Sequence, residues 1–181
     1  MNLQISDYLD QNFKVQESID FSDLKALEDL ISKTHADSKT IWVVGNGGSA
    51  ATASHFVADL VKTTKQFSGN SHKTIALHEL QSLQTAYAND ISFTSAFAES
   101  LKDLSSPGDL LLIISVSGTS KNLIEAKLAA AELHIRTSCI VGQAGVSLKN
   151  DCDAGVVIPS FDYQVVENWH TILLHWFAKT L

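Results

Sequence analysis

Cysteine and proline are both scarce in this chain of 181 residues, which has two of each. Cys139 and Cys152 do not form a Cys-x-x-Cys pair and are too few for a disulfide-rich scaffold, so we expect small, buried side chains at both positions. The few prolines, with 45% hydrophobic and 18% charged residues, exclude disordered and fibrous classes. The length predicts a single domain, 1–181, with a core of its own.

Positive charge is also in deficit, because 13 Lys and Arg residues face 20 Asp and Glu residues, for a net charge of -7. This balance argues against broad nucleic-acid binding but leaves room for a small anion in a local pocket. The chain lacks any apolar run near the roughly 18 to 20 residues that span a bilayer, and residues 1–19 are polar and amphipathic, unlike a signal peptide. We therefore expect a cytoplasmic protein with neither a membrane nor a nucleic acid as partner.

Two familiar nucleotide-binding motifs are absent, since the chain has neither G-x-G-x-x-G nor G-x-x-x-x-G-K-[ST]. A different glycine turn, GNGGS at residues 45–49, follows the apolar residues 41–44, which are typical of a strand buried on both faces. Glycines let a ligand approach main-chain N–H groups, and Ser49 stands where the N-cap of a following helix would be. A phosphate is the ligand that such a turn favours. Glycines that serve only the geometry of the turn are the simpler alternative.

A second stretch in the same context spans residues 115–120, where four hydroxyl side chains surround Gly118 after the apolar run 110–114. Hydroxyl and N–H donors at the end of a buried strand form a cradle for an anion. Because this hydroxyl loop and the glycine turn both follow strands, they could close on one phosphate. Serines are also common in ordinary turns and helix caps, and that alternative stays open.

The remaining pattern alternates strands and helices. Apolar runs predict strands at residues 41–44, 74–77, 110–114, 137–141 and 155–158. Helical patterns fall at residues 50–61, 80–88, 93–104, 121–133 and 161–181, with a polar break at 62–73 and a turn at Asn89 and Asp90. Strands separated by helices predict a parallel sheet, with ligands at the carboxyl ends of its strands.

Two more helices are predicted before the first strand, and a capping signal at residues 21–23 opens the second. We expect this helical pair, within residues 1–38, either to complete an oligomer interface or to pack on its own sheet.

Titratable residues recur at helical spacing on two of the predicted helices. His55 and Asp59 are four residues apart, hence on one face of the helix after the glycine turn. On the last helix, Glu167 and His175 fall within about 80° of each other, whereas His170 and His175 are about 140° apart. One face can therefore present Glu167 with His175, although a single histidine is more often a packed or surface residue than a functional one.

Together, the glycine turn with His55, the hydroxyl loop and the last helix with Glu167 and His175 resemble the SIS (sugar isomerase) domain family. The branch to which they are most similar is that of the sedoheptulose 7-phosphate isomerases, or phosphoheptose isomerases, and the related replication-initiator-associating protein. The resemblance covers essentially the whole chain. It implies the α/β class, with a three-layer αβα sandwich around a flavodoxin-like parallel five-stranded sheet, and a homotetramer with sites at subunit interfaces.

The resemblance also implies a substrate site. By matching motifs, the residues that would hold or flank the phosphate are Asn46, Gly47, Gly48, Ser49, Ser115, Ser117 and Ser120. Asp90 matches an acidic position near the sugar, and Glu167 is predicted to contact the substrate as well.

In the same family, His and Glu on the first of the two helices and Gln and His on the last bind zinc, and the Glu and the last His transfer protons. The matching residues are His55, Asp59, Glu167 and His175, which predicts a zinc site with Asp59 and His175 as catalytic residues. Asp59 stands where Glu is usual, and Glu167 where Gln is usual. The missing methylene withdraws the Asp59 carboxylate by about an ångström, and we hypothesise that Glu167 compensates as a base.

The implied activity is ketose-to-aldose isomerisation of sedoheptulose 7-phosphate to D-glycero-D-manno-heptose 7-phosphate through an enediol. Two alternatives stay open. One is a non-catalytic SIS scaffold that binds a replication-initiator-type protein, which the changes at Asp59 and Glu167 favour. The other is an isomerase of another sugar phosphate, such as a hexulose 6-phosphate. The retained His55 and His175 favour an enzyme.

Overall fold

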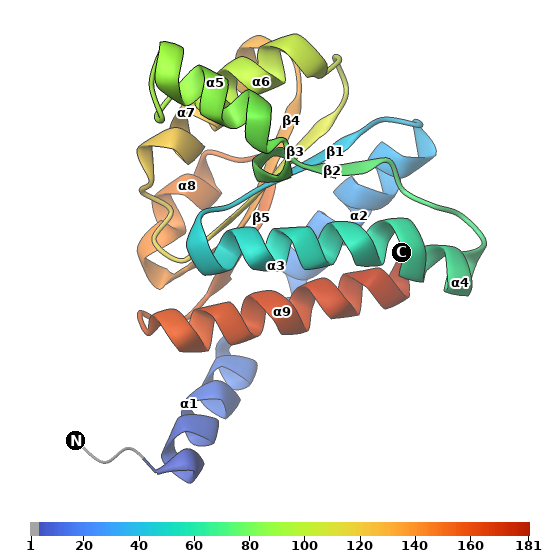
Figure 1. Ribbon diagram of the computed structural model, residues 1–181. Coiled ribbons are helices and arrows are strands. Elements are labelled where there is room, and N and C mark those ends of the chain that lie inside the picture. Colours follow the sequence, from blue (N-terminus) through green and yellow to red (C-terminus); the bar gives the residue numbers. More distant parts are fainter. Residues whose placement is uncertain (1–3) are drawn as a thin grey trace.

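The computed structural model describes residues 4–181, in which five parallel strands form one sheet with the order β2-β1-β3-β4-β5 (Figure 1). The strands are β1 (Ile41–Val44), β2 (Thr74–Ala76), β3 (Leu110–Ser115), β4 (Arg136–Gly142) and β5 (Ala154–Ile158). Each coincides with one of the predicted apolar runs, and the order is that of flavodoxin-like sheets. The predicted parallel five-stranded α/β fold is therefore confirmed.

The central strands are apolar, except for Ser115 at the end of β3, because both of their faces are covered. Every residue of β1 and β3 is buried. On β1, Ile41 and Val43 pack into one hydrophobic cluster, whereas Trp42 and Val44 pack into another on the opposite face. Such strands read as continuous hydrophobic runs without polar alternation.

Helices cover the two faces and complete the three layers. One layer contains α2 (Phe21–Ala36), α3 (Gly47–Ala58) and α9 (Tyr163–Thr180). The other contains α6 (Ala96–Leu104), α7 (Lys121–Glu132) and α8 (Val146–Asn150). A further helix, α5 (Gln81–Asp90), lies beside α6 (Figure 1). The predicted αβα sandwich has this layering.

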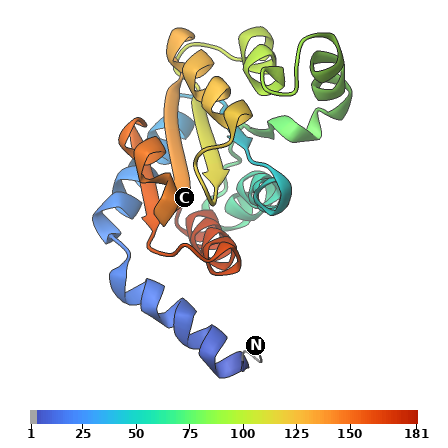
Figure 2. The ribbon, with the colours of Figure 1, turned by 90° about the vertical axis from the view of Figure 1, so that its left-hand side faces the viewer.

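The two N-terminal helices have different environments. α2 buries Leu24, Leu27 and Ile31 and packs against β5, so it belongs to the sandwich. Among the residues of α1 (Ile5–Ser18), all of which the structure describes, Val15 alone is buried. α1 extends away from the sandwich (Figures 1 and 2). Packing on its own sheet therefore accounts for α2 but not for α1.

The helix after the glycine turn is longer than predicted. α3 continues through a π-helical turn (Asp59–Thr63) into α4 (Thr64–Ser68), so the polar stretch from residue 62 does not break it. Thr64 is buried, and the Ser68 hydroxyl donates a hydrogen bond to the Thr64 carbonyl at 2.9 Å, which satisfies polar groups within the helix. Gly69, with φ of 80°, ends it.

The other differences from the predicted elements are shifted helix ends and one additional short helix. Asn46, not Ser49, is the N-cap of α3, so Ser49 lies inside the first turn. The N-cap of α2 is Asp20, just before the predicted capping signal. Asn89 and Asp90 are the last residues of α5 and do not form a separate turn. α8 was absent from the prediction because five residues are too short to show a helical period.

Asp109 ties the start of β3 to the start of β1. Its buried carboxylate accepts hydrogen bonds from the main-chain N–H groups of Thr40 and Ser106 and from the indole N–H of Trp42, each at 2.9 Å. A buried carboxylate needs several such donors. The bonds support a register in which Val44, at the end of β1, pairs with Ile113 near the end of β3.

Two other expectations concern composition. Cys139 is buried and Cys152 half-buried, and both thiols are free. Throughout residues 4–181, the helices are too short or too polar to cross a bilayer.

Two buried histidines make stability depend on pH. His170 on α9 and His72 before β2 are almost fully buried, and burial lowers the pKa of each from 6.5 to about 4. The helical wheel did not show that His170 faces the sheet.

We predict that the free energy of unfolding decreases as the pH falls from 6.5 toward 4, because the unfolded chain then binds protons that the folded chain does not. Each histidine contributes a slope of at most about 1.4 kcal/mol per pH unit. Urea unfolding at several pH values measures the slope, and His170→Leu should reduce it. The matched control is His134→Asn, at an exposed histidine. An unchanged slope in His170→Leu contradicts the prediction.

Candidate functional site

The carboxyl ends of β1 and β3 form the crevice in which this fold positions a ligand. The two strands are neighbours, but the chain leaves β1 for α3 on one face and leaves β3 for α7 on the other. The glycine turn and the hydroxyl loop consequently line one hollow of about 270 Å³. Its polar lining consists of Asn46, Gly47, Gly48, Ser49, Ser115, Ser117, Ser120, Tyr163 and Glu167. Every residue predicted to hold or flank the phosphate is therefore in one place.

Two helices begin at this hollow without a side-chain cap. Asn46 is the N-cap of α3 and Ser120 that of α7, and neither side chain bonds to its own helix. In contrast, Asp20 and Asp162 do cap α2 and α9. The first-turn N–H groups and the positive dipole ends of α3 and α7 thus remain for a ligand.

Internal hydrogen bonds shape the hydroxyl loop. The Ser115 hydroxyl, on a residue 5% exposed, accepts from the N–H of Gly118 at 3.0 Å, and the Ser117 hydroxyl accepts from the N–H of Thr119 at 3.3 Å. Gly118 has φ of +66°, and an added Cβ would lie 2.6 Å from the Cα of Gly145. Only glycine meets both conditions. The side-chain donors that this loop offers a ligand are hydroxyl O–H groups, which can rotate toward it.

A residue that the sequence pattern did not reveal, Asn122, joins the glycine turn to the start of α7. The amide side chains of Asn46 and Asn122 exchange two hydrogen bonds, each of 2.9 Å, and Asn122 is 3% exposed. Asn122 is the second residue of α7. No spacing rule links positions 76 residues apart, so no local signal could have paired them.

The charge of the hollow is unusual for an anion site. Of its lining residues, all within the described part of the chain, none is Lys, Arg or His. Glu167 contributes a carboxylate, which lies so close to Gly48 that a Cβ at that position would collide with it. Attraction for a phosphate must therefore come from N–H and O–H donors and helix dipoles, against one negative side chain.

The second part of the site lies further along the same two helices. α3 and α9 lie side by side (Figure 1) and run in the same direction, since Gly48 meets Glu167 and His55 meets His175. His55, Asp59 and His175 form a compact group of potential metal ligands. The Nε2 atoms of the two histidines are 3.4 Å apart, and each is 3.7 Å from Oδ2 of Asp59.

These distances fit a metal ion. Zinc takes His nitrogen and carboxylate oxygen ligands at about 2.0 to 2.2 Å, which places tetrahedral ligand atoms about 3.3 to 3.6 Å from one another. The shorter carboxylate of Asp59 therefore still reaches the group, and the Thr63 hydroxyl orients it by donating to its other oxygen, Oδ1, at 3.0 Å. Asp59 also opens the π-helical turn, an irregularity frequent at functional sites.

Glu167 is not part of this group, contrary to the predicted ligand set. Eight residues separate it from His175, which is about 12 Å along the helix axis. The angle between the two residues around the helix axis, on which the prediction was based, does not include this rise along the axis. Glu167 lies instead against Gly48, in the hollow. This position is compatible with the predicted contact between Glu167 and the substrate. It does not support the roles of Glu167 as a zinc ligand or as a compensating base.

Asp90 lies apart from both groups. It is exposed at the end of α5, bonded to the Asn89 amide at 2.9 Å, and is not among the residues that line the hollow. A second hollow, of about 370 Å³, lies between the glycine turn and α5 and α6 and includes His78. The His78 Nε2 is 2.8 Å from the Ser54 hydroxyl, and burial lowers the pKa of His78.

Known proteins resemble this chain over nearly its whole length. The SIS domain family matches residues 7–142. Phosphoheptose isomerase from Geotalea daltonii is 35% identical over 175 residues, covering 95% of this chain and 91% of the relative. Probable phosphoheptose isomerase from Thermoplasma acidophilum is 32% identical over 172 residues, covering 93% and 92%.

Solved structures of phosphoheptose isomerases share the fold of this chain. The phosphoheptose isomerase from Neisseria gonorrhoeae has a TM-score of 0.86 and 27% identity, covering 96% of this chain and 94% of that one. A phosphoheptose isomerase from Francisella tularensis has a TM-score of 0.87 with the same coverage, and at 23% identity it bears on the fold alone. By the extent of the family match and the identity to these relatives, the chain belongs to the SIS domain family.

Proposed function

We propose that this protein is a phosphosugar isomerase that converts sedoheptulose 7-phosphate to D-glycero-D-manno-heptose 7-phosphate. One observation carries the proposal: a single pair of parallel helices, α3 and α9, presents a hollow lined by hydroxyl groups and helix N-termini at one end and the His55, Asp59 and His175 group further along. The relatives named phosphoheptose isomerase support the substrate class.

The separation of the two parts suits a seven-carbon sugar. Gly48 and His55 are seven residues apart on α3, which is about 10 Å along the axis. An extended chain advances about 1.2 Å per bond, so the carbonyl carbon of a 2-ketoheptose 7-phosphate lies about 8 Å from its phosphorus. A hexulose 6-phosphate is one bond shorter. With the phosphate in the hollow, the longer sugar brings its carbonyl nearer the histidines.

The reaction moves protons between neighbouring atoms. A base removes a proton from C1 of the ketose while the C2 oxygen gains one, which gives an enediol; C2 then takes a proton as the C1 hydroxyl loses one, which leaves an aldehyde. Asp59 Oδ2 and His175 Nε2, 3.7 Å apart, are placed to serve adjacent atoms of a substrate when they are not bound to a metal ion. Thr63 fixes the carboxylate of Asp59, so little reorganisation is required.

Zinc is the metal that we propose for the group, with His55, Asp59 and His175 as ligands. Three protein ligands are typical of catalytic zinc sites, whereas structural sites have four. When bound, the ion would polarise the substrate carbonyl and stabilise negative charge on its oxygen.

We predict that Asp59→Ala and His175→Ala each lower kcat on sedoheptulose 7-phosphate by at least about 100-fold, because each removes a proton-transferring group. Affinity for the sugar phosphate should change by less than about threefold, since the hollow is separate. Both variants should also lose bound zinc. Kinetics, calorimetry and metal analysis measure these effects, with Asp151→Asn, at an exposed acid, as control. Wild-type rates in both variants would refute the mechanism.

A different outcome is predicted for Glu167→Gln. Because the carboxylate lines the hollow, its neutralisation removes repulsion from the phosphate, and KM should fall about tenfold, or about 1.4 kcal/mol. Turnover at saturation should stay within about threefold of wild type. Glu125→Gln, which removes an equal charge from the exposed face of α7, should alter neither value. A large loss of kcat in Glu167→Gln would instead restore the role of base.

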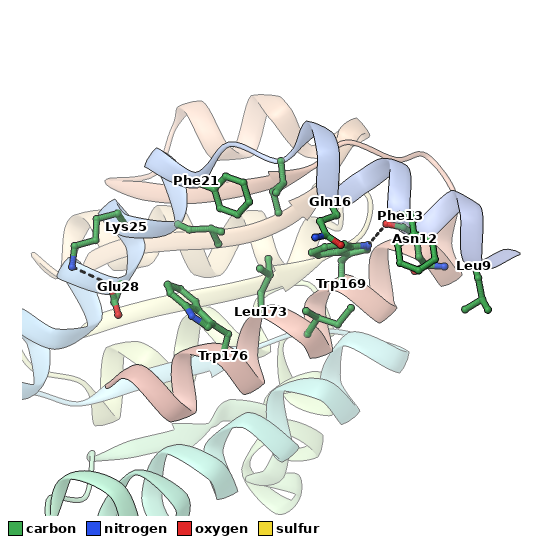
Figure 3. Close-up of a pocket in the computed structure, with 13 residues that line it drawn as sticks. Leu9, Asn12, Phe13, Gln16, Phe21, Lys25, Glu28, Trp169, Leu173 and Trp176 are labelled. Atoms are coloured by element: carbon green, nitrogen blue, oxygen red, sulfur yellow. Dashed lines mark hydrogen bonds and ion pairs between the residues drawn. The ribbon is translucent and has the colours of Figure 1, made fainter.

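A homotetramer is the assembly that we propose. An apolar groove of about 710 Å³ runs between α1, α2 and α9, with Phe13, Phe21, Leu173 and Trp176 among the side chains that line it (Figure 3). Phe13 and Phe21 are 61% and 66% exposed, so two large apolar side chains of this groove are left open to solvent. Because the projecting α1 supplies one wall, a second copy can insert its own α1 there, which is a self-complementary contact. His55 and His175, both largely exposed, would gain cover in such an assembly.

We predict that Phe13→Asp dissociates the assembly, because it places a charge in the apolar groove. Light scattering coupled to size-exclusion chromatography should give a tetramer for wild type and a smaller species for Phe13→Asp. Lys14→Asp, at the exposed neighbouring position, should remain tetrameric. A monomeric wild type, or a tetrameric Phe13→Asp, would be incompatible with this interface.

A further inference from the structure

The amide pair of Asn46 and Asn122 bridges the two loops that form the hollow. Asn46 Nδ2 donates to Asn122 Oδ1, and Asn122 Nδ2 donates to Asn46 Oδ1, both at 2.9 Å. The ladder between β1 and β3 pairs Val44 with Ile113, and beyond it the chain diverges toward α3 and α7. The amide pair therefore holds together the segments that the sheet no longer joins.

The same pair keeps Asn46 from capping α3. Asn46 has φ of -116° and ψ of 153°, the extended backbone of an N-cap, and asparagine is among the best N-cap residues. Its side chain nevertheless makes no capping bond. Its oxygen accepts from the buried Asn122, so the first-turn N–H groups of α3 stay unbound by a side chain. These are the donors that a phosphate needs.

We propose that Asn122 is a positioning residue for phosphate binding, acting through Asn46. It holds the glycine turn and the hydroxyl loop at the separation that one phosphate monoester bridges, and it withholds the Asn46 side chain from α3. The inference rests on the proposed function only in that the hollow binds the phosphate of the substrate. Asn122 does not itself line the hollow, so it would act on a bound phosphate only through its neighbours.

Replacement of Asn122 should separate binding from stability. In Asn122→Ala, the released Asn46 side chain can cap α3, so the melting temperature should fall little while the Kd for inorganic phosphate rises at least about tenfold. KM for sedoheptulose 7-phosphate should rise similarly, with kcat within about threefold of wild type. Asn122→Leu, which keeps the number and branching of the side-chain heavy atoms, should weaken binding equally, and it replaces the alanine variant if that variant folds poorly.

A double-mutant cycle tests whether Asn122 acts through Asn46. Calorimetry with inorganic phosphate on wild type, Asn46→Ala, Asn122→Ala and the double variant should give a double variant no weaker than Asn46→Ala alone. Thr34→Val is the control, because it removes a part-buried hydrogen bond remote from the hollow. That bond joins the hydroxyl of buried Thr34, on α2, to Arg136 at 2.9 Å, and its loss should leave the phosphate Kd unchanged.

Three results would overturn the positioning role: wild-type phosphate affinity in Asn122→Ala and Asn122→Leu, losses that multiply in the double variant, or a wild type that binds no phosphate. The proposed function fails separately. A wild type that binds phosphate but does not turn over sedoheptulose 7-phosphate refutes the isomerase while the cycle still decides the role of Asn122.

Discussion

The pairing of β1 with β3 is the constraint on which the rest of this molecule depends. Asp109 ties the two strands at their N-terminal ends, and the parallel ladder carries that register to Val44 and Ile113. Beyond these residues the chain parts to opposite faces of the sheet, so that the glycine turn and the hydroxyl loop meet in one crevice. The pairing of β1 with β3 therefore sets the position of the hollow. It also brings together the uncapped starts of α3 and α7 and directs α3 toward the histidines.

Much of this arrangement could be predicted from the sequence because its signals are local. Apolar runs at 41–44 and 110–114 identify buried strands, and parallel strands present their carboxyl ends at a common edge. The meeting of the two loops needs only that rule. The proximity of His55 and Asp59 could be predicted in the same way, since residues four apart share a helix face whatever the helix packs against.

The features that escaped prediction depend on contacts across the fold. Asn122 meets Asn46 only because β1 and β3 are neighbours. Glu167 shares a helix face with His175, but two turns of rise place it beside Gly48 instead. The helix continues from Asp59 to Ser68 with threonine and serine hydroxyls bonded within it, although the composition of this stretch is that of a break. His170 is buried against the sheet, which a pattern of single residues cannot reveal.

The common direction of α3 and α9 has an electrostatic consequence. Both helices start at the hollow, whereas His55 and His175 lie within the helices, since the helix that begins as α3 continues to Ser68 and α9 continues to Thr180. Helix dipoles favour negative charge at the start and positive charge near the end. The pair of helices therefore directs two positive dipole ends at the hollow, while the histidines and Asp59 lie further along, away from either helix end. The two dipoles thus favour an extended ligand whose negative group lies at the hollow and whose uncharged end lies along the helices toward the histidines.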